Sequence, residues 1–330
     1  MPTSTPTSAA PADRPDRPLG VGVMLPRNLP ATDILTFARR ADELGFDELW
    51  VVEDLGFHGG FTQAAMALTA TERIRVGIGI LPVAARNIAF TAMEIATLAA
   101  AFPGRLDVGL GHGLPGWIRQ VGAWPKSPLT LLREQTAALR ALLAGERVTV
   151  EGRYVRLTDV QLEAPPAVVP RILAGVRGPR SMALAGEVAD GTVLAEPITP
   201  EYLEVTFDQL GRPEEHRIVT YNVAAVDDDA ETARGIARPG LEWIGEPDWA
   251  VHINPLPFAE EFRQLRASSA DRDEFTRRMP AEWVDQLAIV GTPEAARRRL
   301  EDMAGAGVAT AVLIPAGDPL AALESFARLL

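Results

Sequence analysis

Two adjacent carboxylates, Glu53 and Asp54, follow the apolar run LWVV at residues 49–52. Paired carboxylates beside a buried strand disfavour each other's ionisation, so one of them can hold a proton near neutral pH and act as a proton carrier. The alternative is that one of the two accepts loop N–H groups and only shapes the turn. The pair by itself favours neither interpretation.

A glycine-rich segment, GRLDVGLGHG at residues 104–113, places His112 between Gly111 and Gly113. Strand glycines lack side chains, which lets a flat ligand lie against the backbone. A lone histidine in a loop is more often structural than catalytic. His112 is therefore a candidate that needs support from elsewhere in the chain.

The segment LAGVRGPRS at residues 173–181 joins a predicted strand to a predicted helix. Gly175, Gly178 and Ser181 leave backbone N–H groups open at the helix start, and Arg177 and Arg180 add positive charge. Helix N-termini of this kind bind anions. The alternative is an ordinary strand–helix turn, but the two arginines favour a phosphate site.

The elements that position these residues alternate regularly between strand and helix. Consecutive apolar runs predict strands buried on both faces, and apolar residues at helical spacing predict the helices between them. Strands are expected at 19–25, 49–52, 74–81, 106–110, 171–174, 191–195, 217–226 and 308–314, and helices at 32–44, 61–71, 89–102, 129–144, 181–187, 201–210, 292–303 and 320–330. Residues 148–157 alternate as in an inserted hairpin.

Eight strand–helix units predict an α/β protein, a (β/α)8 TIM barrel with inserted loops. The alternative, an open sheet with a nucleotide at its switch point, is disfavoured because no G-x-G-x-x-G follows the first strand. Active sites of such barrels lie at the carboxyl ends of the strands. Besides the three segments above, those ends include residues 26–28, 79–86, 196–197, 221–226 and 315–318.

Two segments fall outside the repeat. Residues 1–18 are rich in Pro, Ser, Thr and Ala, which predicts a disordered tail before a single barrel domain at 19–330. Residues 239–290 form an excursion between the last two strands, rich in Trp, Pro and acidic residues. Because large aromatic residues are usually core, packing over a barrel end is favoured over a pocket lid or a dimer surface.

Composition excludes several classes of function. The chain has no cysteine, and its four histidines show no metal-site spacing, so a metal-free protein is expected. The net charge of −12 is unfavourable for binding nucleic acid, which requires clustered basic residues. No apolar run approaches the roughly 18 residues of a membrane span, and a cytoplasmic protein is expected.

At these segments the chain resembles the bacterial luciferase-like superfamily of flavin-type oxidoreductases. The resemblance rests on ELGFDELWVVED, TATERIRVGIGILPVAARN, ATLAAAFPGRLDVGLGHG and ILAGVRGPRSMALAGEVADGTVL, in that order. It covers residues 19–330. Within the superfamily the chain is most similar to the branch dependent on coenzyme F420, which includes methylenetetrahydromethanopterin reductase and glucose-6-phosphate dehydrogenase.

The resemblance implies where the cofactor binds. A bulge with a non-proline cis peptide, mapping to Gly79 and Ile80, backs the central ring of the cofactor. Backbone at Val176, Arg177 and Gly178 holds the cofactor phosphate. The second strand's end, which in the family carries an acidic residue and then a catalytic histidine, maps to Glu53 and Asp54.

The chain departs from the family pattern at two positions. Asp54 stands where the family has its histidine, and Leu114 where the sugar-phosphate dehydrogenases have an acid, so sugar-phosphate oxidation is not expected. His58 or His112 would then supply the missing proton chemistry. Leu114, Trp117 and Trp124 favour an apolar or aromatic substrate.

The sequence therefore predicts an oxidoreductase that transfers a hydride between coenzyme F420 and a small organic substrate. Asp54, Glu53, His58 and His112 are its candidate catalytic residues, and Gly79, Ile80, Gly111, Val176, Arg177, Gly178 and Arg180 its candidate cofactor-binding residues. The alternatives are an FMN-dependent monooxygenase and a non-catalytic flavin-binding protein. A homodimer is a family expectation.

Overall fold

A computed structural model of the chain describes residues 19–330, so the predicted tail lies outside the described residues. Eight parallel strands run β1–β2–β3–β4–β7–β8–β9–β11, and pairing of β11 with β1 closes the barrel. The strands are β1 (Gly20–Met24), β2 (Glu48–Val51), β3 (Arg75–Pro82), β4 (Leu106–Gly111), β7 (Arg171–Gly175), β8 (Gly191–Leu194), β9 (Arg217–Val226) and β11 (Thr310–Pro315). The predicted (β/α)8 barrel is confirmed.

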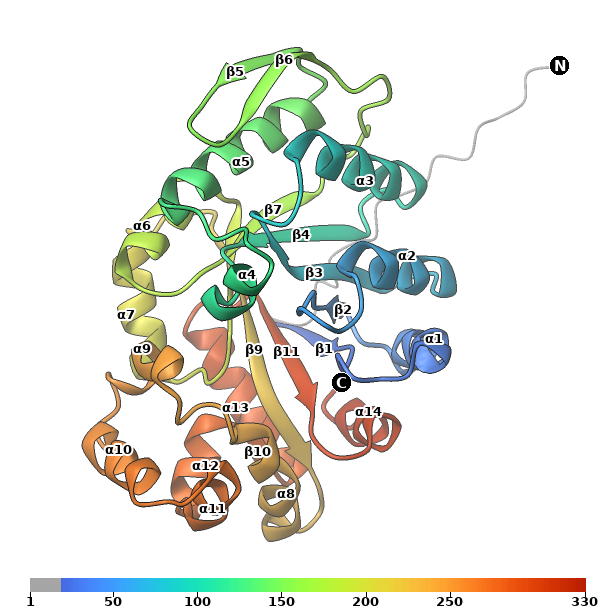
Figure 1. The fold of residues 1–330 in the computed structure, drawn as a ribbon. Helices are drawn as coiled ribbons and strands as arrows, with labels where there is room; N and C mark the ends of the chain where they lie inside the picture. Colours follow the sequence, from blue (N-terminus) through green and yellow to red (C-terminus); the bar gives the residue numbers. More distant parts are fainter. Residues whose placement is uncertain (1–18) are drawn as a thin grey trace, which may run out of the picture.

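Helices cover the outside of the barrel (Figure 1). They are α1 (Ile34–Leu44), α2 (Gly60–Ala70), α3 (Ile88–Ala101), α5 (Pro128–Leu143), α6 (Pro179–Val188), α7 (Pro200–Leu210), α8 (Ala230–Ala237), α13 (Pro293–Gly305) and α14 (Pro319–Ala327), with the short α4 (Pro115–Gln120) after β4. Gly45 ends α1 with a φ of 95°, which only glycine adopts without strain. The Thr292 side chain accepts a hydrogen bond from the Ala295 N–H at the start of α13, as its predicted cap requires.

Two insertions extend from the barrel and lie far apart in Figure 1. The antiparallel hairpin of β5 (Val148–Glu151) and β6 (Arg156–Val160) packs beside α5. The excursion at residues 239–290, called the cap below, lies beside α7 and α8. Its elements, with their neighbours at either end, are 3-10 helices Arg238–Leu241 and Pro247–Trp249, helices α9 (Ala250–Ile253), α10 (Ala259–Ala267), α11 (Arg272–Arg278) and α12 (Ala281–Leu287), and strand β10 (Ile289–Gly291), which pairs with the end of β9.

The cap has an apolar core of its own. Trp249, Phe262 and Phe275 are buried together with Val223 of β9 and Val290 of β10. This packing joins the cap to the long end of β9 and accounts for much of its aromatic content. Among residues 19–330, no helix has the length and hydropathy needed to cross a membrane.

Two glycines of β3 make room for an indole ring inside the barrel. A Cβ atom on Gly77 would lie 2.4 Å from the ring of Trp50, and one on Gly79 would lie 2.3 Å from the Tyr221 hydroxyl. Trp50 is fully buried, and its Nε1 donates to Glu48 at 2.8 Å. The filled interior leaves the carboxyl ends of the strands as the place for chemistry.

Candidate active site

The bulge in β3 lies at the carboxyl end of the barrel. The register between β3 and β4 shifts between Ile78 and Leu81, and the peptide between Gly79 and Ile80 is cis, as predicted. The Ile80 side chain lies against the next two strands of the barrel, β4 and β7. A Cβ on Gly175 would lie 2.2 Å from Ile80 Cγ2, and a Cβ on Gly111 would lie 3.0 Å from Ile80 Cδ1 and 2.3 Å from the Gly175 carbonyl oxygen.

The space left by Gly111 is thus taken by Ile80 and by backbone. The sequence analysis expected a flat ligand in this space. It could not anticipate Ile80 there, because Ile80 belongs to another strand. Gly111 therefore contributes to the site by letting the bulge pack closely on β4 and β7.

Glu53 is fully engaged in positioning the loop after β2. Its two carboxylate oxygens accept hydrogen bonds from Arg86 at 2.5 and 2.8 Å, and Oε2 also accepts from the Gly60 N–H at 2.7 Å. Gly60 is the first residue of α2. Of the two predicted alternatives for the carboxylate pair, the turn-shaping role describes the contacts of Glu53.

Asp54 has a different environment from its neighbour. Its Oδ2 accepts a hydrogen bond from Arg27 at 2.9 Å, and its side chain is 25% exposed. The Arg27 guanidinium in turn lies 4.9 Å from the centre of the Phe57 ring. One carboxylate oxygen, Oδ1, has no salt bridge within residues 19–330. Asp54 is therefore the member of the pair that keeps one carboxylate oxygen outside any ion pair of the described residues.

His58 connects two loops. Its Nε2 lies 2.9 Å from the Leu29 carbonyl oxygen, and since a carbonyl only accepts, Nε2 is the donor. Leu29 follows β1 and His58 follows β2, so this bond ties together the two loops that carry Arg27 and Asp54. The contact gives His58 a supporting position beside the site.

His112 lies against the start of α6. Its Nε2 is 3.1 Å from the Ser181 Oγ, and its Nδ1 is buried without a hydrogen-bond partner in the described part of the chain. Burial lowers the pKa of His112 below its usual value, so the ring is neutral at pH 7. The neutral ring therefore connects the end of β4 to the first turn of α6 through Nε2.

The predicted anion turn is open. Gly178 precedes α6 with a φ of 78°, no side chain caps the helix, and a Cβ placed on Gly178 would have no atom within 4 Å. Val176 is buried and Arg180 is exposed on the first turn of α6. Arg177 turns toward the cap, where its guanidinium lies 4.6 Å from the centre of the Trp249 ring. An uncapped helix start beside two arginines fits a phosphate group.

Glu196, two residues after the end of β8, is a candidate site residue that the sequence analysis did not single out. Burial raises the pKa of its carboxyl group; Arg177 and Arg27 oppose this shift, and the negative charge of Asp54 reinforces it. Unlike Glu53 and Asp54, it forms no ion pair with an arginine in the described structure. The sequence does show that Glu196 follows a strand. The absence of an arginine ion pair, which sets Glu196 apart from Glu53 and Asp54, depends on the fold and cannot be read from the sequence.

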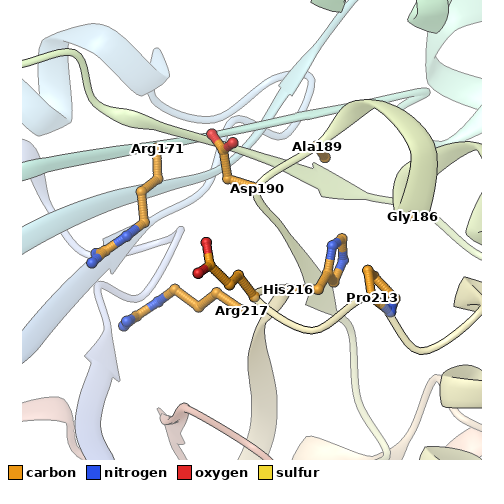
Figure 2. A pocket seen from close by; sticks show the side chains of 8 residues that line it. Arg171, Gly186, Ala189, Asp190, Pro213, His216 and Arg217 are labelled. Atoms are coloured by element: carbon orange, nitrogen blue, oxygen red, sulfur yellow. The ribbon is translucent and has the colours of Figure 1, made fainter.

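A hollow of about 440 Å³ opens at the other end of the barrel (Figure 2). Arg171 and Arg217, which line it, are the first residues of β7 and β9. Arg217 also reaches into the barrel floor, where it pairs with Glu48. Because this is the amino-terminal face, which in such barrels serves stability, we do not place the active site here.

Comparison with known proteins shows which family the chain is similar to. The luciferase-like monooxygenase family model matches residues 13–310. The 5,10-methylenetetrahydromethanopterin reductase of Methanolobus tindarius is 29% identical over 303 residues, which are 88% of this chain and 91% of the relative. An F420-dependent glucose-6-phosphate dehydrogenase of Beutenbergia cavernae is 33% identical over 173 residues, or 49% of this chain and 52% of that protein.

The fold is shared with a solved structure. The coenzyme F420-dependent tetrahydromethanopterin reductase from Methanopyrus kandleri superposes with a TM-score of 0.82 at 22% identity, covering 94% of this chain and 98% of the other.

Proposed function

The chain belongs to the luciferase-like monooxygenase family, and from that premise we propose that it transfers a hydride between coenzyme F420 and a small organic substrate. The observation that carries the proposal is the open turn at Gly178, flanked by Arg177 and Arg180 and adjoining His112. It lies at the same barrel end as the bulge at Gly79 and Ile80. The F420-dependent relatives favour the deazaflavin over FMN.

The residues present fit this cofactor in two places. The uncapped start of α6, with backbone at Val176, Arg177 and Gly178 and the side chain of Arg180, would hold its phosphate. The bulge at Gly79 and Ile80 would support its ring. Coenzyme F420 supplies the hydride acceptor or donor when bound, and the protein supplies position and proton transfer.

Proton transfer is assigned to two carboxyl groups with different surroundings. Asp54 accepts a hydrogen bond from Arg27 at Oδ2, which leaves Oδ1 as the oxygen that would face a proton of the substrate or cofactor. Glu196 has a raised pKa and so holds a proton more readily than an ordinary glutamate. Two titratable groups with surroundings this different are suited to the roles of base and acid. His112, whose Nε2 lies 3.1 Å from the Ser181 Oγ, would hold the start of α6 in place beside the bound cofactor.

We further propose that the substrate is apolar or aromatic. Leu114 and Trp117, at the start of α4, are half-buried and follow His112 along the chain. Trp124, after α4, is covered by Arg119, whose guanidinium lies 5.0 Å from the ring centre. These side chains offer apolar contact area rather than the charges that a sugar phosphate would require.

The deciding experiment is a parallel binding titration of the purified apoprotein with coenzyme F420 and with FMN. Preferential binding of F420, weakened by Arg180→Glu, supports the proposal. Preferential binding of FMN would replace it with an oxygen-activating monooxygenase, and binding without turnover of any substrate would indicate a non-catalytic flavin-binding protein. Failure to bind either cofactor would refute both the assignment of the turn and the function.

A further inference from the structure

One short stretch of the cap, residues 248–252, contacts the residues that follow two neighbouring barrel strands. It contacts Arg177, which follows β7, and Pro197, which follows β8. We propose that this stretch positions the cofactor-binding turn, with Trp249 acting on the cofactor through Arg177. The inference rests on the proposed function, because it assigns cofactor affinity to a part of the chain that does not itself belong to the anion turn.

Arg177 is held from two directions. Its guanidinium lies 4.6 Å from the centre of the Trp249 ring, and its Nη1 donates to the Asp248 carbonyl oxygen at 3.3 Å. Trp249 is 8% exposed. A cation over an aromatic face is attracted more strongly where water is excluded. The contact therefore restricts a side chain that would otherwise sample many rotamers beside the anion turn.

Trp249 is in turn fixed within the cap. The ring centres of Trp243 and Trp249 are 6.4 Å apart, and the Arg272 guanidinium lies 3.5 Å from the centre of the Trp243 ring. Arg272 forms an ion pair with Glu246 at 2.9 Å, and Arg266 pairs with the same carboxylate. The guanidinium and indole groups thus form a row from the barrel mouth into the cap.

The second contact reaches the strand end that carries Glu196. The His252 Nδ1 lies 3.2 Å from the Pro197 carbonyl oxygen and is the donor, since that oxygen only accepts. The imidazole also packs 4.1 Å from the Tyr202 ring and has no exposed surface. Pro197 directly follows Glu196, so the cap stretch fixes both strand ends from the same side.

The expected consequence is preorganisation. A turn whose arginine and backbone are already ordered loses less conformational freedom when an anion binds, and so binds it more tightly. Trp249 is accordingly a positioning residue. Removing its ring should weaken cofactor binding more than it alters the chemical step at saturating cofactor.

The test compares Trp249→Leu with Trp249→Phe and with Trp283→Leu, by calorimetric titration of F420, or of FMN if that is the cofactor bound. Trp283 is a matched control because it is half-buried in the same cap and stacks on Phe258, 4.6 Å away, rather than on an arginine. Loss of a cation–aromatic contact should raise the cofactor Kd about 2- to 30-fold in Trp249→Leu. Trp249→Phe should recover most of the affinity, and Trp283→Leu should retain it.

Two further measurements keep the inference testable whatever the folding of Trp249→Leu. In a double-mutant cycle with Arg177→Gln, the milder Trp249→Met should have no added effect on the Kd if it acts through Arg177. Hydrogen exchange of the apoprotein should show faster exchange at residues 176–182 in Trp249→Met than in wild type. Additive effects in the cycle, or unchanged exchange, would overturn the inference. The exchange measurement needs no cofactor. It can therefore refute this inference even if the proposed function is wrong, and the two failures can be told apart.

Discussion

Replacing Glu53 by Gln should destabilise the fold without removing the proposed proton acceptor. Gln keeps one oxygen for the Gly60 N–H but presents an NH2 group to Arg86, so one of two charge-assisted hydrogen bonds and the ionic attraction are lost. The side chains of the Arg86–Glu53 pair are 31% and 14% exposed, so solvent screens them only in part. A hydrogen bond to a charged group contributes about 1.5–3 kcal/mol. At roughly 2 °C per kcal/mol for a chain of this size, Tm should fall by about 3–6 °C.

The matched variant is the neighbouring Asp54→Asn, measured in the same calorimetric scan and the same turnover assay. Asp54 is more exposed than Glu53 and pairs with a single arginine, so its Tm should change little. Loss of a proton acceptor should lower its turnover by about 10²–10⁴-fold, with cofactor affinity retained. The reasoning is refuted if Glu53→Gln leaves Tm unchanged, or if Asp54→Asn turns over at the wild-type rate, in which case His112 becomes the candidate.

Three other outcomes are expected. Glu196→Gln should lower turnover by about 10²–10⁴-fold. It should also raise Tm at pH 7, because a carboxyl group with a raised pKa in the folded state costs stability as the pH rises above 4.5 through that pKa. A wild-type rate and pH profile in this variant would exclude Glu196 as the acid. Gly175→Ala should destabilise by about 1–3 kcal/mol in denaturant unfolding, since its Cβ would lie 2.2 Å from Ile80 Cγ2; wild-type stability would mean that the bulge yields freely. Burial lowers the pKa of His252 to about 3, so below pH 6.5 the unfolded chain binds a proton on His252 and the folded chain does not. Tm should therefore fall less steeply with acidification in His252→Phe than in wild type. An equal slope in the two proteins would contradict a buried neutral ring.

The sequence was sufficient to predict the barrel and the ends of its strands. Apolar runs and helical periodicity are local properties, and so are signals such as Gly45 after α1 and Thr292 before α13. The hairpin beside α5 was equally readable from its alternation. The place of the cap between β9 and β11 followed from the strand count, but the small strand β10 inside it did not.

The site was less predictable because its residues differ in their partners rather than in their type. Glu53 and Asp54 are neighbours with the same functional group, and only the positions of Arg86 and Arg27 separate their roles. Glu196 stands out because no arginine pairs with it, a property that no stretch of sequence reveals. Likewise, the aromatic content of the cap indicated packing, but not that Trp249 would lie over Arg177.

The glycines around Ile80 also bear on how this family of sequences can diversify. At Gly175 the atoms nearest to a new Cβ all belong to the Ile80 side chain, whereas at Gly111 the nearest is a backbone carbonyl oxygen. A lineage could therefore acquire alanine at 175 once residue 80 had become smaller, but the reverse order would pass through a destabilised ancestor. No change at residue 80 opens the same path at 111. Gly175 can thus be replaced by alanine after a single compensating change at residue 80, whereas Gly111 cannot.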